Sequence, residues 1–154
     1  MAKRKARIDS AAEAVRVMGK ATLEIQPPAN VPLDAEDLPF FNNVISEYAR
    51  SEWSAHQLEL AAMLARTMAD LTREQKLLRD EGGVAYSEKG TPVANPRKSI
   101  VQMHAGSILS FRRSLSLHAR AQAGEARDVA KRRDTAKGIE ADNPLEEDDL
   151  LARP

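Results

Sequence analysis

Three histidines are the first residues to test for metal-binding or catalytic chemistry. They stand at His56, His104 and His118. None belongs to a His-Glu-x-x-His or His-x-x-x-His pattern, and the chain has no cysteine to act as a thiolate ligand. His104 falls on an apolar helix face, where a core or interface histidine is more common than a ligand. The sequence therefore predicts no metal site and no cofactor.

Other catalytic patterns are also missing from the sequence. It contains no Gly-x-x-x-x-Gly-Lys-Ser/Thr loop to hold nucleotide phosphates and no Gly-x-Ser-x-Gly nucleophile turn. The carboxylates of residues 140–149 fall in a segment too polar to hold an acid and a base rigidly together. We expect no catalytic residue, and we predict that the chain is not an enzyme.

Basic side chains offer a different chemistry, the binding of phosphates. The formal net charge is +0, from 23 basic and 23 acidic residues, but the charges are segregated. Residues 1–20 carry six Lys or Arg against two acids, and residues 112–137 carry eight against three. Residues 138–154 carry one against six. Such asymmetry concerns partners rather than fold. Solvated chain ends and a polyanionic partner both remain open interpretations.

Two sets of basic residues are candidates for DNA contacts. A basic N-terminal arm can contact phosphates or enter a minor groove, so we rank the arm and the helix after it first. This set is Lys3, Arg4, Lys5, Arg7, Arg16 and Lys20. The second set ranks lower, because it could instead line an oligomer or pair with the acidic tail. Its members are Arg112, Arg113, Arg120, Arg127, Lys131, Arg132 and Arg133.

A first helix is expected to position part of the N-terminal set. Ser10 and Glu13 form a capping box, and apolar residues recur at helical spacing as far as Ile25. Pro27 and Pro28 are expected to end this helix. We therefore assign residues 1–26 to a basic arm and helix that are candidates for DNA binding, and residues 27–36 to a linker.

Residues 37–119 are expected to form a helical core. The second helix should begin near Pro39 and end around Ser51. The third should start at the capping box of Ser54 and run to about Asp80. At about 25 residues, or nearly 40 Å, it is long for a small domain, which suggests burial by other subunits.

The second and third helices also fit a helix-turn-helix, with the short connection of residues 50–54 between them. Against this, Glu59 sits near the start of the helix that would have to contact bases. Arg66 and Arg73 share a face of the third helix and are a fallback location for DNA contacts.

A β-hairpin is predicted at residues 84–94, with strands at 84–86 and 92–94 and a turn containing Gly90. Asn95 and Pro96 then read as the start of a fourth helix. More apolar surface is available on the third and fourth helices than one subunit can cover, which predicts a cyclic homo-oligomer larger than a dimer. The expected interface residues are Leu64, Met68, Leu71, Ile100, Ile108 and Phe111.

The C-terminal part should consist of a basic helical extension at residues 120–137 and an acidic disordered tail at residues 138–154. No apolar run approaches the roughly 20 residues that a membrane helix needs, and the absence of cysteine gives no sign of an oxidising compartment. We interpret the chain as intracellular. The predicted fold class is mainly α, with an N-terminal helical DNA-binding region and long antiparallel helices around a short hairpin in a ring-forming core.

One stretch of about residues 38–120 resembles the small terminase subunits of tailed bacteriophages. A long helix is followed by Gly82-Gly83-Val84-Ala85-Tyr86, then by a turn and Val93-Ala94-Asn95-Pro96, and then by a second long helix. The family often continues with a Leu-Gly-Leu-Thr-Pro-like turn. The segment from Leu115 to Arg120 is similar but lacks the glycine and proline, so the fourth helix is expected to continue to about Thr135.

The resemblance implies a protein that recognises the packaging site on double-stranded viral DNA, forms a ring and hands DNA to the large terminase subunit. That large subunit carries the ATPase and nuclease, and the host cell cytoplasm is the implied location. Two alternatives share some of these features. A helix-turn-helix transcription regulator would share the basic arm, and a phage head-scaffolding protein would share the long helices and the charged tail.

Overall fold

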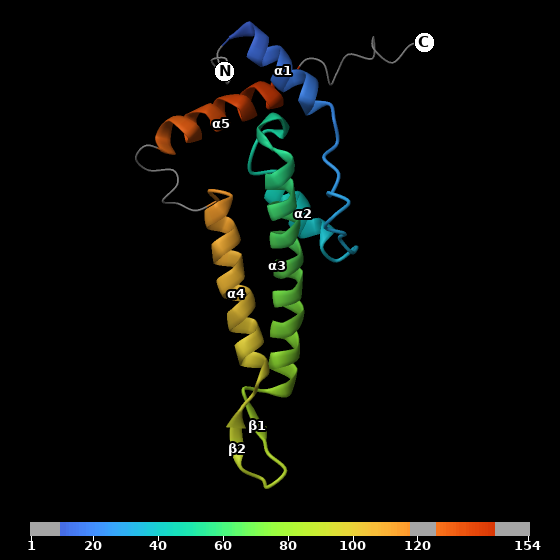
Figure 1. The fold of residues 1–154 in the computed structure, drawn as a ribbon, viewed down its shortest axis with the longest axis vertical. Helices are drawn as coiled ribbons and strands as arrows, with labels where there is room; N and C mark the ends of the chain where they lie inside the picture. The colour runs from blue at the N-terminus through green and yellow to red at the C-terminus, as the bar shows by residue number, and fades with distance from the viewer. Residues whose placement is uncertain (1–9, 118–125, 144–154) are drawn as a thin grey trace. The chain divides into compact units, whose positions relative to one another are not determined.

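The computed structural model describes residues 10–117 and 126–143, which hold five α-helices, one 3₁₀ helix and a two-stranded hairpin (Figure 1). The mainly α fold class with a short hairpin is confirmed. Contacts divide the chain into two compact units. The terminal unit consists of residues 1–26, 45–55 and 118–154, and the hairpin unit consists of residues 27–44 and 56–117. The described residues nearest the two ends of the chain, 10–26 and 126–143, therefore belong to one unit.

In the terminal unit, helix α1 (Ala11–Ala21) begins where the capping box predicts. The Ser10 hydroxyl accepts a hydrogen bond from the Glu13 backbone N–H at 3.3 Å. The helix ends at Ala21, well before Pro27, so the expected end was too late. Thr22 closes it, because its hydroxyl donates back to the Gly19 carbonyl at 3.0 Å.

Two further elements complete the terminal unit, the 3₁₀ helix η1 (Arg50–Glu52) and helix α5 (Ala126–Ala141). Both α1 and α5 pack against η1 and against each other. The small apolar core contains Val17, Ala49 and Ala136, with Ile139 packed against it. Helix α5 therefore continues past residue 138, where a disordered tail was expected to begin, because Ile139 has an apolar surface to cover.

In the hairpin unit, helix α2 (Leu38–Ile45) precedes the long helix α3 (Ala55–Glu81). The start of α2 and the extent of α3 agree with the expected ranges within a residue or two. Helix α2 ends earlier than expected, at Ile45, because the indole N–H of Trp53 donates to the Ile45 carbonyl at 3.0 Å. The α2–α3 connection therefore spans residues 46–54 and contains η1, which is longer than the turn of a typical helix-turn-helix.

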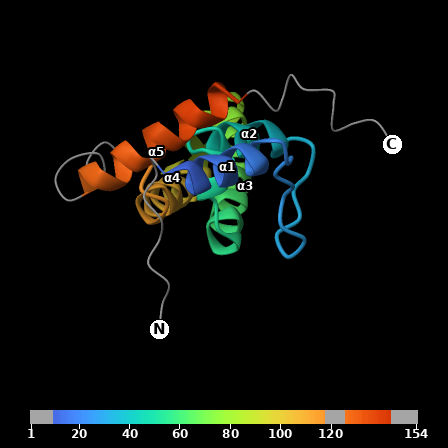
Figure 2. The ribbon, with the colours of Figure 1, turned by 90° about the horizontal axis from the view of Figure 1, so that it is seen from above.

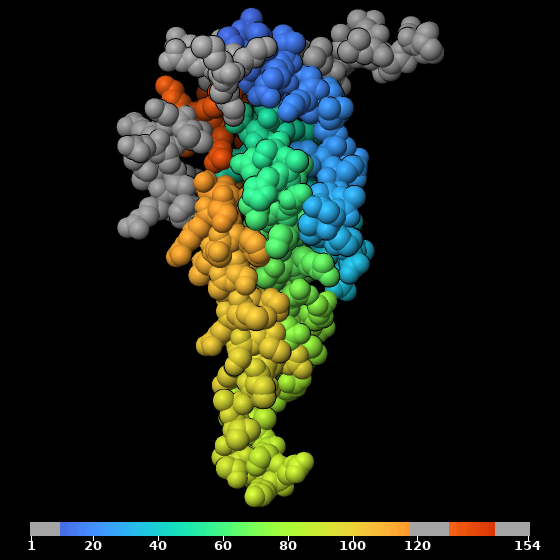
Figure 3. Space-filling view, in the orientation of Figure 1, coloured from blue at the N-terminus to red at the C-terminus, as the bar shows by residue number. Residues whose placement is uncertain are grey.

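The hairpin has the predicted strands. Gly82, at a φ of 82°, ends α3 in a backbone conformation that favours glycine. Strand β1 (Val84–Tyr86) pairs antiparallel with strand β2 (Pro92–Ala94), with Ala85 opposite Val93. In the space-filling view the hairpin forms the narrow end of its unit, beyond the ends of the two long helices (Figure 3).

Helix α4 (Arg97–Ser114) runs antiparallel to α3 and ends in a clean break, so the expected continuation to Thr135 was wrong. Ser116 takes the left-handed conformation, with a φ of 58°. The Leu117 N–H donates to the Arg112 carbonyl at 2.8 Å, and the Ser116 N–H donates to the Arg113 carbonyl at 3.0 Å. These bonds make a Schellman motif with serine in the position that usually holds glycine.

The core of the hairpin unit is unevenly distributed. Phe41 and Val44 of α2 are buried, as are Leu64 and four alanines of α3. Helix α4 adds Ile108 alone, and Leu115 follows it. From Asp70 to Glu81 on α3, and from Arg97 to Ser107 on α4, no side chain is buried. The half of the helix pair next to the hairpin thus has no closed core of its own.

Candidate nucleic-acid interface

The N-terminal candidates for DNA binding divide between described and undescribed residues. Lys3, Arg4, Lys5 and Arg7 lie outside the residues that the structure describes. Arg16 and Lys20 lie on the exposed side of α1, whose opposite side buries Val17 and Ala21. The placement of these two side chains on the solvent side agrees with the periodicity of the sequence.

Arg16 is engaged by an acid of its own helix. Its Nη2 lies 2.6 Å from Oε1 of Glu13, and its Nε donates to Oε2 of Glu13 at 3.0 Å. This bidentate bond raises the pKa of Arg16. Its side chain is 39% exposed, so a DNA phosphate would compete with Glu13 for the guanidinium.

Glu13 also holds helix α5. The Arg132 Nη2 donates to Oε1 of Glu13 at 2.8 Å, and the Arg132 Nε lies 3.6 Å from Oε1 of Glu52. Glu13 is nearly buried, at 6% exposure, and accepts from two guanidinium groups. This ion network joins α1, η1 and α5, and it leaves the Arg132 side chain 21% exposed. Arg132 belongs to the second set of DNA candidates, but Glu13 and Glu52 would compete with a DNA phosphate for its guanidinium.

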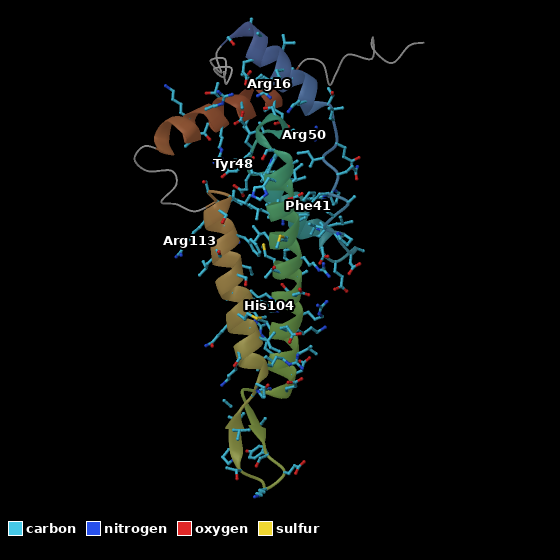
Figure 4. All side chains as sticks on the ribbon, viewed as in Figure 1. Arg16, Phe41, Tyr48, Arg50, His104 and Arg113 are labelled. Carbon is cyan, nitrogen blue, oxygen red and sulfur yellow. The ribbon has the colours of Figure 1, made fainter. Side chains whose placement is uncertain are left out.

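Three further contacts fasten α5. The Arg50 backbone N–H donates to Oε2 of Glu140 at 2.9 Å, and the Lys137 ammonium donates to the Ser46 carbonyl at 2.8 Å. The Arg133 guanidinium stacks 3.8 Å from the centroid of the Tyr48 ring (Figure 4 labels Tyr48 and Arg50). Burial raises the pKa of Tyr48, and the positive charge of Arg133 opposes that rise. Most described cations of α5 thus serve the fold of the terminal unit.

Two lysines of this unit remain available for a phosphate. Lys20 in the last turn of α1 and Lys131 on α5 are exposed, and neither forms an ion pair within residues 10–117 and 126–143.

Only part of the ion network around Glu13 could be found from the sequence. The 3-residue spacing of Glu13 and Arg16 is visible there. The bond between Glu13 and Arg132, which are 119 residues apart, has no local signal, and sequence reasoning missed it.

The residues expected at an oligomer interface occupy different environments. Leu64 and Ile108 are buried within the subunit, at 1% and 8% exposure, so they form its own core. Met68, Leu71 and Phe111 are half-buried. Ile100 is 40% exposed. Of the six, Ile100 is thus the one whose side chain lies largely on the surface.

A polar latch fixes the junction of α3, the hairpin and α4. Arg97 bonds both Glu81 and Glu74 of α3. The buried Asn95 amide donates to Oε2 of Glu81 and to the Gly82 carbonyl, each at 3.0 Å, while its oxygen caps α4 by accepting from the Arg97 N–H at 2.9 Å. The bonds from Arg97 and Asn95 lower the pKa of Glu81 to about 2.

A recess of about 430 Å³ lies beside α3 in the same unit. Residues 34–37 supply Asp34, Glu36 and Asp37, and α3 supplies Arg66, Asp70 and Arg73. Arg73 is bonded to Asp70. The fallback face for DNA contacts, with Arg66 and Arg73, is therefore surrounded by carboxylates, which oppose a phosphate backbone.

The family follows from comparison with known proteins. A sequence model of the Hendrixvirinae small terminase family matches residues 1–154. The chain is also 32% identical over 159 residues to the small subunit of terminase from Enterobacteria phage HK97, covering 100% of this chain and 98% of that protein. The chain belongs to the Hendrixvirinae small terminase family.

The resemblance noted from the hairpin and its Asn-Pro sequence is thus confirmed. In this small terminase, the hairpin follows the long helix and Asn95 caps the next one, as the resemblance implies. Among the described residues no group of His, Asp or Glu is arranged to hold a metal ion. The helices described are also too short or too polar to cross a bilayer.

Proposed function

We propose that this small terminase subunit recognises viral DNA, assembles into a ring, and recruits or regulates the large terminase ATPase and nuclease during genome packaging in the host cytoplasm. The observation that carries the proposal is the match of the whole chain to the small terminase family. The division into two units supports a division of labour. The terminal unit would bind DNA, and the hairpin unit would assemble.

The charges support the placing of DNA at the terminal unit. The arm residues Lys3, Arg4, Lys5 and Arg7 adjoin α1 in sequence, and Lys20 and Lys131 are exposed in the same unit. In the hairpin unit, carboxylates surround Arg66 and Arg73. Each subunit would contribute a weak contact, and repetition around a ring would multiply the affinity.

We also propose that the subunit has no enzymatic activity of its own. The sequence lacks nucleotide-binding and nucleophile motifs. The large subunit would supply both ATP hydrolysis and DNA cleavage, and the chain described here would act through binding. ATP hydrolysis that survives purification to homogeneity, and is lost on substitution of a residue of this chain, would overturn this part.

DNA binding can be tested by gel shift on packaging-site DNA of the virus that encodes the chain. One variant replaces Lys3, Arg4, Lys5 and Arg7 with alanine. A control removes the same number of positive charges from exposed positions of the hairpin unit, at Lys76, Arg79, Lys89 and Lys98. We expect the arm variant to lose at least tenfold in affinity and the control to lose much less, because phosphate contacts depend on the position of each charge.

The outcome also tells the arm from the hairpin unit as the place where DNA binds. If the control variant loses affinity and the arm variant does not, DNA binds the hairpin unit. If neither variant loses affinity, Lys20 and Lys131 become the next residues to replace. The proposed regulation of the large terminase is tested separately. The chain is added to purified large terminase, and the rate of ATP hydrolysis by the large terminase is measured.

A further inference from the structure

Among the described residues of the hairpin unit, none covers the outward face of helix α4. In both views α3 lies between α4 and the segment of residues 27–37 (Figures 1 and 2), so the side of α4 away from α3 is uncovered within its unit. This face exposes Met103 by 60% and Leu109 by 56%. Large apolar side chains this exposed are costly when they remain in water.

The same face lacks formal charge. From Ser99 to Phe111 the helix contains no Asp, Glu, Lys or Arg, although 30% of the chain is charged. A helix face that remains in solvent is normally covered with charged side chains. Interface centres, by contrast, are depleted of charge and enriched in Met. The composition of α4 is thus that of an interface helix.

Gly106 also lies on this face. A Cβ added to it would meet nothing within 4 Å, so no neighbour within the described residues requires a glycine. Glycine in a helix interior lowers stability relative to alanine. Its absent side chain would instead allow another backbone to approach closely.

The ends of the hairpin unit supply complementary charges. Arg112 and Arg113 are exposed at the end of α4 and form no ion pair within the described part of the chain. Arg113 lies on the side of α4 away from α3 (Figure 4). The recess, on the other side of α3, carries the exposed carboxylates of Asp34 and Glu36.

These two charged features lie at a similar level along the helices. The latch sets Arg97 beside Glu81. Because α3 and α4 are antiparallel, Arg113 lies about 24 Å from that junction, which is also the distance of Ala65. Arg66 and Asp70, which line the recess, are therefore close to this level. A neighbouring copy moved sideways, without sliding along the helix axis, would bring opposite charges together.

We propose that the outward face of α4 docks on a second copy of this chain, with Met103, Gly106 and Leu109 at its centre. Arg113 then pairs with the carboxylates of the neighbour's recess, Glu36 first among them. The two surfaces are different and lie on opposite sides of α3, so the contact is head-to-tail and repeats until a ring closes. This inference rests on the proposed ring and names the surfaces that build it.

A pair of substitutions at exposed apolar positions, one on each unit, provides the sharpest test. Leu109→Asp changes an exposed side chain and should leave the fold intact while reducing the mass measured by light scattering to that of a subunit, 16.9 kDa. Val15→Asp is the control, since Val15 is 67% exposed on α1 of the terminal unit, and it should keep the wild-type mass. Circular dichroism should show unchanged helix content in both.

A charge exchange tests the second surface. Arg113→Glu should weaken assembly at least tenfold in subunit concentration, and combining it with Glu36→Arg should restore assembly. The assigned surfaces are wrong if Leu109→Asp keeps the wild-type mass, or if the double variant does not regain assembly. Either result leaves the proposed ring unaffected. A wild-type chain that is monomeric at micromolar concentration would instead overturn the proposed ring. A Leu109→Asp variant that keeps its mass but no longer stimulates large terminase would reassign the face to that partner.

Discussion

At the scale of single residues, Glu13 and Ser116 show how one side chain or one dihedral angle decides a larger feature. Glu13 accepts from Arg16 and Arg132 and is nearly buried, so its charge holds together helices from the two ends of the chain. Ser116 adopts a left-handed conformation that is costly for a residue with a Cβ. It thereby ends α4 after Ser114, where the surrounding sequence would allow more helix.

Replacement of the Glu13 carboxylate should loosen the terminal unit. Glu13→Gln keeps the shape but removes the charge that two guanidinium groups share, and we expect a loss of about 2–3 kcal/mol in the stability of that unit. Hydrogen exchange of the α1 and α5 amides is the measurement. Glu24→Gln, at an exposed position just after α1, is the control and should change protection little. Equal protection in both variants would show that the network does not hold the unit.

Glycine at residue 116 should stabilise the hairpin unit. Ser116→Gly removes the left-handed strain and should gain about 0.5–1 kcal/mol, after the added entropy of glycine in the unfolded chain is subtracted. Ser114→Gly, in the last helical turn, should lose a similar amount. Urea unfolding of both variants gives the comparison, and two destabilised variants would argue against the strain at Ser116.

At the scale of elements, the helices belong to their units through a few polar contacts rather than through large cores. The terminal unit has a core of valine and alanine with an ion network above it. In the hairpin unit, the latch of Arg97, Glu81 and Asn95 joins α3 to α4 next to a region without buried side chains. Polar contacts therefore hold α3 and α4 together at the end of the pair where no side chain is buried.

The latch should make stability depend on pH in the acid range. The pKa of Glu81 is lowered from 4.5 to about 2, so its ionised form stabilises the folded state above about pH 4.5. That contribution should disappear as the pH falls toward 2, because the folded carboxylate is then protonated too. Glu81→Gln should flatten the decline of the melting temperature over this range, whereas Glu88→Gln in the hairpin turn should not. An unchanged slope for Glu81→Gln would contradict the assignment.

Truncations should separate the roles of α5 and of the residues after it. A chain that ends at Asn143 keeps all of α5, and we expect both the fold and the oligomer to persist. A chain that ends at Thr135 loses Ala136, Ile139 and Glu140, which hold α5 in place. We expect its terminal unit to unfold while the hairpin unit still assembles. Light scattering and hydrogen exchange measure the two effects, and monomers from the first truncation would reject this division.

At the scale of the whole molecule, a chain with no net charge is proposed to bind a polyanion. Without a net positive charge, affinity for DNA must come from where the basic residues lie and from their repetition around a ring. Acids and bases balance at 23 each over the full sequence, so long-range attraction of DNA to a single subunit should be weak. Avidity then becomes the main source of affinity.

Loss of assembly should therefore weaken DNA binding without any change in the terminal unit. If Leu109→Asp yields monomers, its affinity for packaging-site DNA should fall by 100-fold or more, about the lower limit for multivalent gain. Wild-type binding should also weaken steeply with salt, because each neutralised phosphate releases counterions. Gel shifts at several salt concentrations measure both effects. Full affinity in a monomeric variant would show that a single subunit suffices.

The sequence by itself determined where most helices begin, the hairpin and the family of this protein. The capping boxes that begin at Ser10 and Ser54, and the glycine and proline positions around 82–96, are local signals, and α1, α3 and the hairpin begin close to where these signals predict. The full-length family match confirmed the resemblance carried by the hairpin and Asn95-Pro96. These features depend on neighbours a few residues apart, which a linear pattern records.

Only the tertiary structure decided how the elements share cores and charges. The sequence gives no local sign that Glu13 binds Arg132 or that α5 joins α1. It also did not reveal that α2 ends at Ile45 or that Ser116 ends α4. Contacts between residues far apart in the chain decide these features, since they depend on which surfaces meet after the helices form.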